Sequence, residues 1–210
     1  LPILMMPRMN GYKLCKTIKE NINISHIPVI LLTARDDRQS QISGYKNGAD
    51  GYLSKPFEVE MLMELIRNRL KNREYTKKRY LNAGLIPTPE ESTISLTDET
   101  FLIKLNSIIQ ENIENSNLGI QFICQEVGLG RSSLYNKLKA LTGMGANEYI
   151  SKLRIEKAIT LISGTDMPFS EIAEKTGFTT PSYFSTAFKQ YTGETPSQYK
   201  ERKKKGLAGK

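Results

Sequence analysis

Residues 177–193 read GFTTPSYFSTAFKQYTG, and residues 128–143 read GLGRSSLYNKLKALTG. Each stretch follows a short segment with apolar residues at helical spacing, ICQEV at 123–127 and IAEKT at 172–176. The offset between the two copies is 49 residues at the first glycine and 50 at the last, so the second copy has one extra residue in its turn. An internal repeat of this kind predicts two copies of one helix-turn-helix unit.

Both copies contain the residues that such a unit needs. The glycine that ends the first segment can adopt a positive φ, which allows the chain to turn sharply. The next residue is apolar, Leu129 or Phe178, and is expected to fill the gap between two helices. Serines then cap the start of a second helix. The side chains predicted to point inward from that helix are Leu134, Leu138 and Leu141 in the first copy and Phe184 and Phe188 in the second.

The opposite face of each second helix carries short polar and basic side chains. An α-helix fits the major groove, so these side chains can approach base edges and phosphates. The predicted DNA-binding residues are Arg131, Ser132, Tyr135, Asn136 and Lys139 in the first copy and Thr180, Ser182, Tyr183, Thr186 and Lys189 in the second. A plain helical bundle with polar outer faces is the alternative, and it is disfavoured because the pattern occurs twice.

Residues 147–163 lie between the copies and form a predicted amphipathic helix. A rigid connector would fix the spacing of the two reading helices. To enter one face of a duplex they should lie about one DNA turn, roughly 34 Å, apart.

Residues 98–203 resemble the AraC/XylS-type DNA-binding domain. The resemblance rests on the paired units, on RIEKA at 154–158, and on the block at 177–193 followed by PSQY at 196–199. It implies base contacts by Ser132, Tyr135 and Asn136 on the first reading helix, with Arg131 and Lys139 near phosphate. On the second reading helix it implies contacts by Ser182, Tyr183 and Thr186.

The N-terminal third alternates short apolar runs with helical stretches. PVILLTA at 28–34 is typical of a strand buried on both faces, and GYLS at 51–54 is a second short strand. Helices are predicted at 37–47, before Gly48, and at 58–70. Strand and helix alternating with short connections imply a parallel α/β sheet.

Residues 2–71 resemble the latter part of a response-regulator receiver domain, from MMPRMNG at 5–11 to KPF at 55–57. The resemblance implies switch-like roles for Thr33, Tyr52 and Lys55. The threonine hydroxyl can bond a phosphoryl oxygen, the lysine can pair with an acyl phosphate, and the aromatic ring can swing inward when the threonine moves.

The phosphate-accepting aspartate of the receiver family aligns with Ile3, so no phosphoacceptor is expected. The first strand, which would carry the acidic pair for Mg²⁺, is missing. Because the chain begins with Leu1 rather than Met, we expect a piece of a longer protein or a degenerate remnant. The implied parent is a hybrid two-component regulator with a sensor kinase, a receiver and this output domain in one polypeptide. A half-sheet with open edges predicts instability, strand exchange or a homodimer.

The predicted organisation is therefore a partial flavodoxin-like α/β receiver remnant followed by an all-α domain with two helix-turn-helix units joined by a long helix. The boundaries are 1–71 for the receiver segment, 72–97 for a linker, 98–203 for the DNA-binding domain and 204–210 for a basic tail. The linker assignment rests on a charged run at 72–80 and on Gly84, Pro87 and Pro89. The all-α domain begins with Asp98-Glu99 and an apolar stripe of Phe101, Leu102, Leu105, Ile108, Ile109 and Ile113.

The net charge of +8 and the isoelectric point of about 9.4 favour a polyanionic partner. Residues 119–210 carry 14 lysines and arginines against 8 aspartates and glutamates, a net charge of +6. Part of this excess is KERKKK at 200–205, which is either a solvated basic tail or a phosphate contact.

Other classes of protein fit the sequence poorly. Cys15 and Cys124 are far apart and are expected to be free thiols in a reducing cytoplasm. A single histidine, His26, disfavours histidine-based metal sites and a nucleophile–histidine–acid set, so neither metal, cofactor nor enzymatic activity is expected. The chain has no apolar run of the roughly 18 residues that a membrane span needs, so no membrane contact is expected.

We therefore predict a cytoplasmic, sequence-specific DNA-binding transcription regulator, the output part of a two-component signalling protein. Its expected partners are double-stranded DNA, a second copy of the chain, and RNA polymerase. The alternative is a protein-interaction or dimerisation module with vestigial DNA binding. Equal and weak affinity for random and promoter DNA would favour that alternative.

Overall fold

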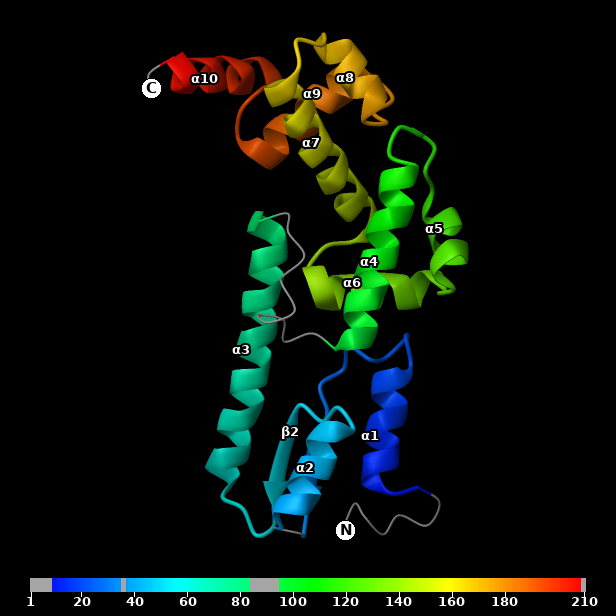
Figure 1. Cartoon of the computed structure of the whole chain (residues 1–210), viewed down its shortest axis with the longest axis vertical. Coiled ribbons are helices and arrows are strands. Elements are labelled where there is room, and N and C mark those ends of the chain that lie inside the picture. The colour runs from blue at the N-terminus through cyan, green and yellow to red at the C-terminus, as the bar shows by residue number, and fades with distance from the viewer. Residues whose placement is uncertain (1–8, 35–36, 84–94, 209–210) are drawn as a thin grey trace. The chain divides into compact units, whose positions relative to one another are not determined.

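The computed structural model describes residues 9–34, 37–83 and 95–208 (Figure 1). The chain divides into two compact units. The first unit contains residues 1–103 and 132–143, and the second contains residues 104–131 and 144–210. The first helix-turn-helix copy is thus shared between the units, because its second helix belongs to the first unit and its first helix to the second.

The first unit contains the predicted parallel sheet. Its elements begin with α1 (Gly11–Glu20), β1 (Ile30–Thr33), α2 (Arg38–Lys46) and β2 (Gly51–Ser54). The two strands pair in parallel, with Ile30 opposite Gly51 and Thr33 opposite Ser54. The α/β assignment and the predicted positions of both strands and of α2 are confirmed.

Local signals in the sequence explain why these helices begin where they do. The Asn10 side chain accepts a hydrogen bond from the Lys13 N–H at the start of α1, and Asp37 does the same for Ser40 at the start of α2. The core between them contains Cys15, Leu31, Ala49 and Tyr52.

The long helix α3 (Val59–Ala83) runs well beyond its expected end near residue 70. The first part of the expected linker, from residue 72, is therefore helical as far as Ala83. Residues 72–83 are charged but contain neither glycine nor proline, and most of them are good helix formers. The remaining linker signals, Gly84, Pro87 and Pro89, lie outside the described residues.

Helix α4 (Leu96–Glu111) begins two residues before Asp98. The predicted apolar stripe is confirmed as core: Phe101, Leu102, Leu105, Ile108 and Ile109 of α4 are buried, and so is Ile113 in the turn after it. Helix α6 (Arg131–Thr142) is the second helix of the first copy. Its predicted inward residues Leu134, Leu138 and Leu141 are buried as well.

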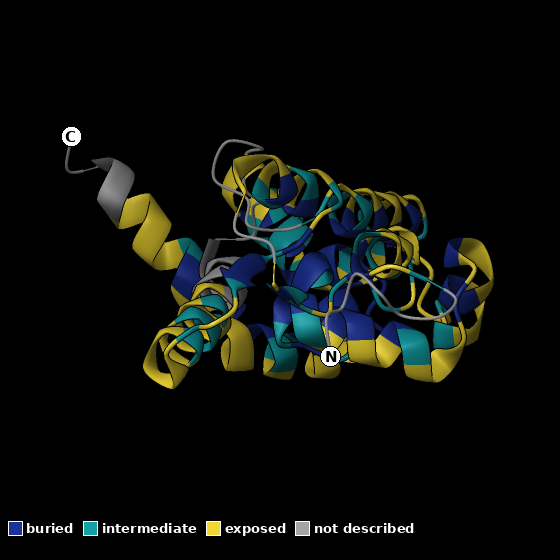
Figure 2. Ribbon diagram, turned by 90° about the horizontal axis from the view of Figure 1, so that it is seen from below, coloured by how far each residue is buried: buried dark blue, intermediate teal, exposed yellow. Residues whose placement is uncertain are grey.

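The second unit contains only helices among its described residues. They are the C-terminal part of α4 from Lys104 onward, α5 (Ile120–Val127), α7 (Ala146–Gly164), α8 (Phe169–Lys175), α9 (Pro181–Thr192) and α10 (Pro196–Ala208). The predicted connecting helix, now α7, is confirmed. Residues 204–208 of the expected basic tail continue α10, in which residues 201–205 are exposed (Figure 2).

Candidate nucleic-acid interface

The turn of the second copy leaves no room for a side chain at Gly177. This residue has a φ of 72°, and a Cβ built on it would lie 2.2 Å from the Ile113 carbonyl oxygen. The turn is closed by the N–H of Phe178, which donates to the Ala173 carbonyl oxygen at 2.9 Å. Glycine is therefore required here both by the backbone conformation and by the close approach of the loop after α4.

Helix α9 begins with a side-chain cap. The Thr180 hydroxyl oxygen accepts a hydrogen bond from the Tyr183 N–H at 3.1 Å, and Pro181 occupies the first helical position. Thr180, which the sequence predicts to bind DNA, thus has a structural role at the start of the helix as well as an exposed position.

An aromatic cluster fixes the inward face of α9. Phe184 and Phe188 are fully buried. Their ring centroids lie 5.7 Å apart, and the Phe188 ring contacts that of Tyr199 at 5.5 Å. The Phe178 ring, the predicted plug of the turn, lies 5.3 Å from the Phe184 ring. Edge-on and tilted contacts of this kind add to the free energy of burying the rings.

The connecting helix α7 is held to its surroundings by polar side chains. Arg154 donates from Nη2 to the Asn115 carbonyl oxygen at 2.7 Å, and its guanidinium lies 6.0 Å from the Phe178 ring centroid. Burial lowers the pKa of Arg154. The Tyr191 hydroxyl of α9 donates to Glu156 of α7 at 3.2 Å, so the second reading helix is tied directly to the connector.

The outward face of α9 is polar, as predicted. Tyr183 is 55% exposed. Ser182, Thr186 and Lys189 are exposed too, and the Thr186 hydroxyl donates to the Ser182 carbonyl oxygen at 3.0 Å. The structure therefore gathers the predicted residues of the second copy on one accessible helix surface.

The turn of the first copy has the same backbone but more space. Gly128 has a φ of 71°, and a Cβ there would meet no atom within 4 Å. The plug residue Leu129 is buried, and its N–H donates to the Cys124 carbonyl oxygen at 2.9 Å. The exposed residues at the start and along the outer face of α6 are Arg131, Ser132, Tyr135, Asn136 and Lys139, with Tyr135 at 53%.

The burial of Lys137 in α6 was not predicted from the sequence. This lysine lies three residues after Leu134 and one before Leu138, and like them it is buried. This helical spacing places Lys137 on the inward face of α6 and is the sequence signal for its burial. Its residue type masked the signal, because lysine is rarely buried without a partner.

The predicted switch residues of the receiver segment lie on the two strands or directly after them. Thr33 ends β1 and is buried, and its carbonyl oxygen accepts from the Lys55 N–H at 2.6 Å. Tyr52 lies inside the core, and burial raises the pKa of its hydroxyl. The Lys55 side chain is exposed. Ile3, at the expected phosphoacceptor position, lies outside the described residues.

Within residues 9–34, 37–83 and 95–208, no three histidine, cysteine, aspartate or glutamate side chains are grouped as metal ligands would be. Cys15 and Cys124 are buried and free. None of the helices in these ranges has the length and apolar character to cross a membrane.

Comparisons with known proteins match both parts of the chain. Residues 4–67 match the response regulator receiver domain, and residues 123–202 match a helix-turn-helix domain. Both resemblances seen in the sequence are confirmed. The chain thus carries a response regulator receiver segment followed by an AraC-type helix-turn-helix domain.

Individual proteins and solved structures match different shares of the chain. The chain is 42% identical to "Histidine kinase P4" of Formosa agariphila over 95% of its own length, but it spans only 14% of that protein. It is 29% identical to "Probable transcriptional regulator ycf29" of Pyropia yezoensis, with 69% of this chain and 70% of that one covered. Among solved structures, the C-terminal domain of the two-component response regulator yesN from Fusobacterium nucleatum is 32% identical. That match covers 46% of this chain and 93% of the other, with a TM-score of 0.43.

Proposed function

We propose that this chain binds double-stranded DNA in a sequence-specific way and regulates transcription as the output part of a two-component signalling protein. The observation that carries the proposal is that two repeated helices, α6 and α9, each bury an inward face and expose a polar and basic outer face. A helix with such a face can lie in the major groove, where side chains distinguish base pairs.

Within this proposal the residues have different tasks. Asn136 is suited to reading a base edge, because an amide can both donate and accept hydrogen bonds. Lys189, near the end of α9, is suited to a phosphate contact, because a lysine amine acts as a flexible point charge. Ser132, Tyr135, Ser182 and Tyr183 complete the two reading surfaces.

Assembly and location extend the proposal. We expect the chain to bind paired sites as a homodimer, to contact RNA polymerase, and to act in the cytoplasm without catalysing a reaction. A parent protein that also carries a sensor kinase would place signal input and DNA output in one polypeptide, as the partial coverage of the kinase relative suggests.

The experiment is a selection of bound duplexes from a random pool with the full chain, followed by binding titrations at several salt concentrations. The logarithm of the binding constant should fall linearly with the logarithm of the salt concentration. Asn136→Ala should relax the preference at one position, by about 1–3 kcal/mol. Lys189→Ala should weaken binding to all sequences alike and reduce the salt slope by about one.

Matched controls replace a lysine and an asparagine at other positions of the chain. Lys46→Ala in α2 and Asn68→Ala in α3 alter exposed residues outside both reading surfaces and should leave specificity and salt slope unchanged. If the folded chain prefers no duplex over any other at moderate ionic strength, the proposal is wrong and an interaction module is the better explanation.

A further inference from the structure

Lys137 is fully enclosed, with a relative exposure of 0%, although it lies on a helix proposed to read DNA. Its amine cannot contact a phosphate while the side chain is in this position. A buried ammonium group is costly unless other groups pair with it, so its partners explain why it is there.

Three polar side chains from three distant segments of the first unit meet at this amine. Lys137 Nζ donates to Ser25 Oγ at 2.7 Å and to Asp98 Oδ1. The Ser25 hydroxyl in turn donates to Asp98 Oδ1 at 2.7 Å. Asp98 and Ser25 are 3% and 1% exposed, so the whole cluster is closed to solvent.

The surroundings act on the charge of Lys137 in opposite directions. Burial lowers the pKa of Lys137, and the hydrogen bond and charge of Asp98 oppose that shift. The Phe101 ring centroid lies 5.1 Å from the amine and adds a cation–π contact. Apolar side chains in this place could pack in several arrangements. The three hydrogen bonds among Lys137, Ser25 and Asp98 are satisfied in only one. The cluster therefore defines position more than it adds net stability.

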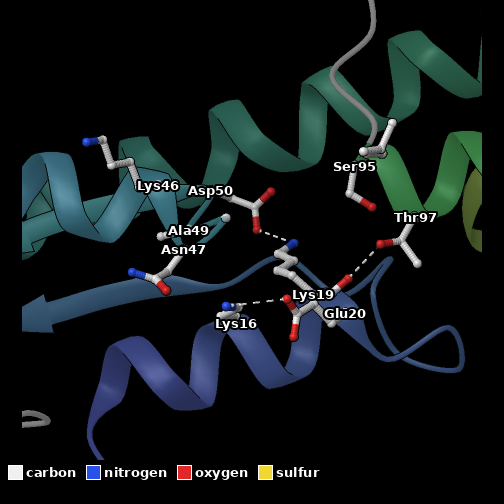
Figure 3. A pocket seen from close by; sticks show the side chains of 11 residues that line it. Lys16, Lys19, Glu20, Lys46, Asn47, Ala49, Asp50, Ser95 and Thr97 are labelled. Atoms are coloured by element: carbon white, nitrogen blue, oxygen red, sulfur yellow. Dashed lines mark hydrogen bonds and ion pairs between the residues drawn. The ribbon is translucent and has the colours of Figure 1, made fainter.

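A second bond joins the same segments. The Thr97 hydroxyl, next to Asp98 in the first turn of α4, donates to the Lys19 carbonyl oxygen at 3.0 Å (Figure 3). This bond borders a cavity of about 550 Å³, whose lining includes the ion pair of Lys19 with Asp50 at 2.6 Å. Residues 19–25 of the receiver segment are thus bonded to the start of α4 at both ends.

We propose that Lys137 is a positioning residue that couples the first reading helix to the receiver segment. Through Asp98 and Ser25, a displacement of the turn at residues 21–27 is transmitted to α6, and DNA bound to α6 constrains that turn in return. The coupling rests on the proposed function, because α6 must contact DNA for it to matter. In the second copy the matching position is Ala187, offset by 50 residues, so this coupling is specific to the first copy.

The test measures amide hydrogen exchange of residues 21–27 in the full chain with and without a duplex obtained by selection. In the wild type, saturating DNA should slow exchange in this turn by about tenfold. The double variant Lys137→Met/Asp98→Asn removes both charges at similar volume. It should bind the duplex within about threefold of the wild type, while the slowing falls below about twofold.

The control alters a comparable buried lysine in the second unit. Lys152→Met/Glu156→Gln removes the pair at 3.7 Å in α7 and should leave the slowing in the turn unchanged. If Lys137 had only a structural role, its double variant would not lose the slowing of exchange in the turn while still binding DNA.

Each remaining outcome has a defined meaning. Equal slowing in the wild type and the double variant overturns the coupling, whereas a wild type without sequence preference overturns the proposed function instead. If the double variant does not fold, Ser25→Ala removes only the bridging hydroxyl. It should reduce the slowing to less than about threefold, and an undiminished slowing in this variant also overturns the coupling.

Discussion

The two helix-turn-helix copies share a sequence pattern but are held by different interiors. The second reading helix packs Phe184 and Phe188 into an aromatic cluster and is bonded to α7 through Tyr191. The first has Leu134 where the second has Phe184, and the buried Lys137 where the second has Ala187. A repeat therefore conserves the surface that can meet DNA while its supports diverge. The second copy packs aromatic rings in its interior, whereas the first adds a buried polar cluster to its packed leucines.

Truncating the matched core residues gives the largest effect and compares the two supports directly. Phe184→Ala should lower the free energy of unfolding by about 3–5 kcal/mol, because a fully buried ring and two ring contacts are lost. Leu134→Ala at the equivalent position should cost about 2–4 kcal/mol. Chemical denaturation of both variants measures the difference, and a larger loss for Leu134→Ala would reverse the comparison.

Removing one charge of the buried pair should be the next largest effect. Lys137→Met alone leaves the Asp98 carboxylate enclosed without its cation and should lower stability by about 3 kcal/mol. Adding Asp98→Asn should restore most of the loss, because the uncompensated charge disappears. Denaturant titrations of the single and double variants form a mutant cycle. Additive losses would mean that the two side chains do not act as a pair.

Much of the difference between the two copies can be predicted from the sequence, but the buried polar cluster of the first copy cannot. The repeat, the glycine turns, the inward leucines and phenylalanines and the exposed outer faces all follow from spacing and residue type. Lys137 and Asp98 do not, because charged residues are assigned to the surface unless a partner is known. The partners come from distant segments, because Asp98 is 39 residues and Ser25 is 112 residues away from Lys137, and no local pattern encodes such contacts.

The other departures have local causes. Helix α3 continues to Ala83 because charged residues form helices well, although a charged run also resembles a linker. Thr180 precedes Pro181, a combination typical of a helix start, so its capping role was readable from the sequence. The roles of the ten predicted DNA-binding residues stay predictions, because exposure alone does not distinguish a base contact from a solvated side chain.

Substituting alanine for each turn glycine compares the backbone constraints of the two copies. Gly128→Ala should cost about 1 kcal/mol, since only the positive φ is unfavourable and the space is open. Gly177→Ala should cost about 2–3 kcal/mol, because its Cβ would also collide with the Ile113 carbonyl oxygen. Thermal or chemical unfolding of the two variants measures both costs, and equal losses would show that the loop after α4 yields easily.

Alkaline pH should loosen the second copy slightly. Burial, together with the charge and the hydrogen bond of Glu156, raises the pKa of Tyr191 to about 12. The hydroxyl therefore stabilises the folded chain below its ordinary value near 10, and this contribution is lost as the pH rises towards 12. The contribution should be less than about 1 kcal/mol, because Tyr191 is 40% exposed.

Tyr191→Phe isolates that contribution. The difference in stability between the wild type and this variant should be smaller at about pH 11.5 than at about pH 9. A difference that stays constant between these conditions would show that the bond to Glu156 does not stabilise the folded chain.

Dissolved salt ions act differently on the outer face of the first reading helix, α6, and on the buried cluster around Lys137. Added salt weakens contacts with DNA phosphates, since the counterions released when the protein binds then gain less entropy. The same ions screen exposed charges over about 8 Å at physiological strength, but they cannot enter the closed space around Lys137. A salt concentration that releases the chain from a duplex should thus leave α6 attached to the receiver segment. The free protein would then meet its next site with the helix already oriented.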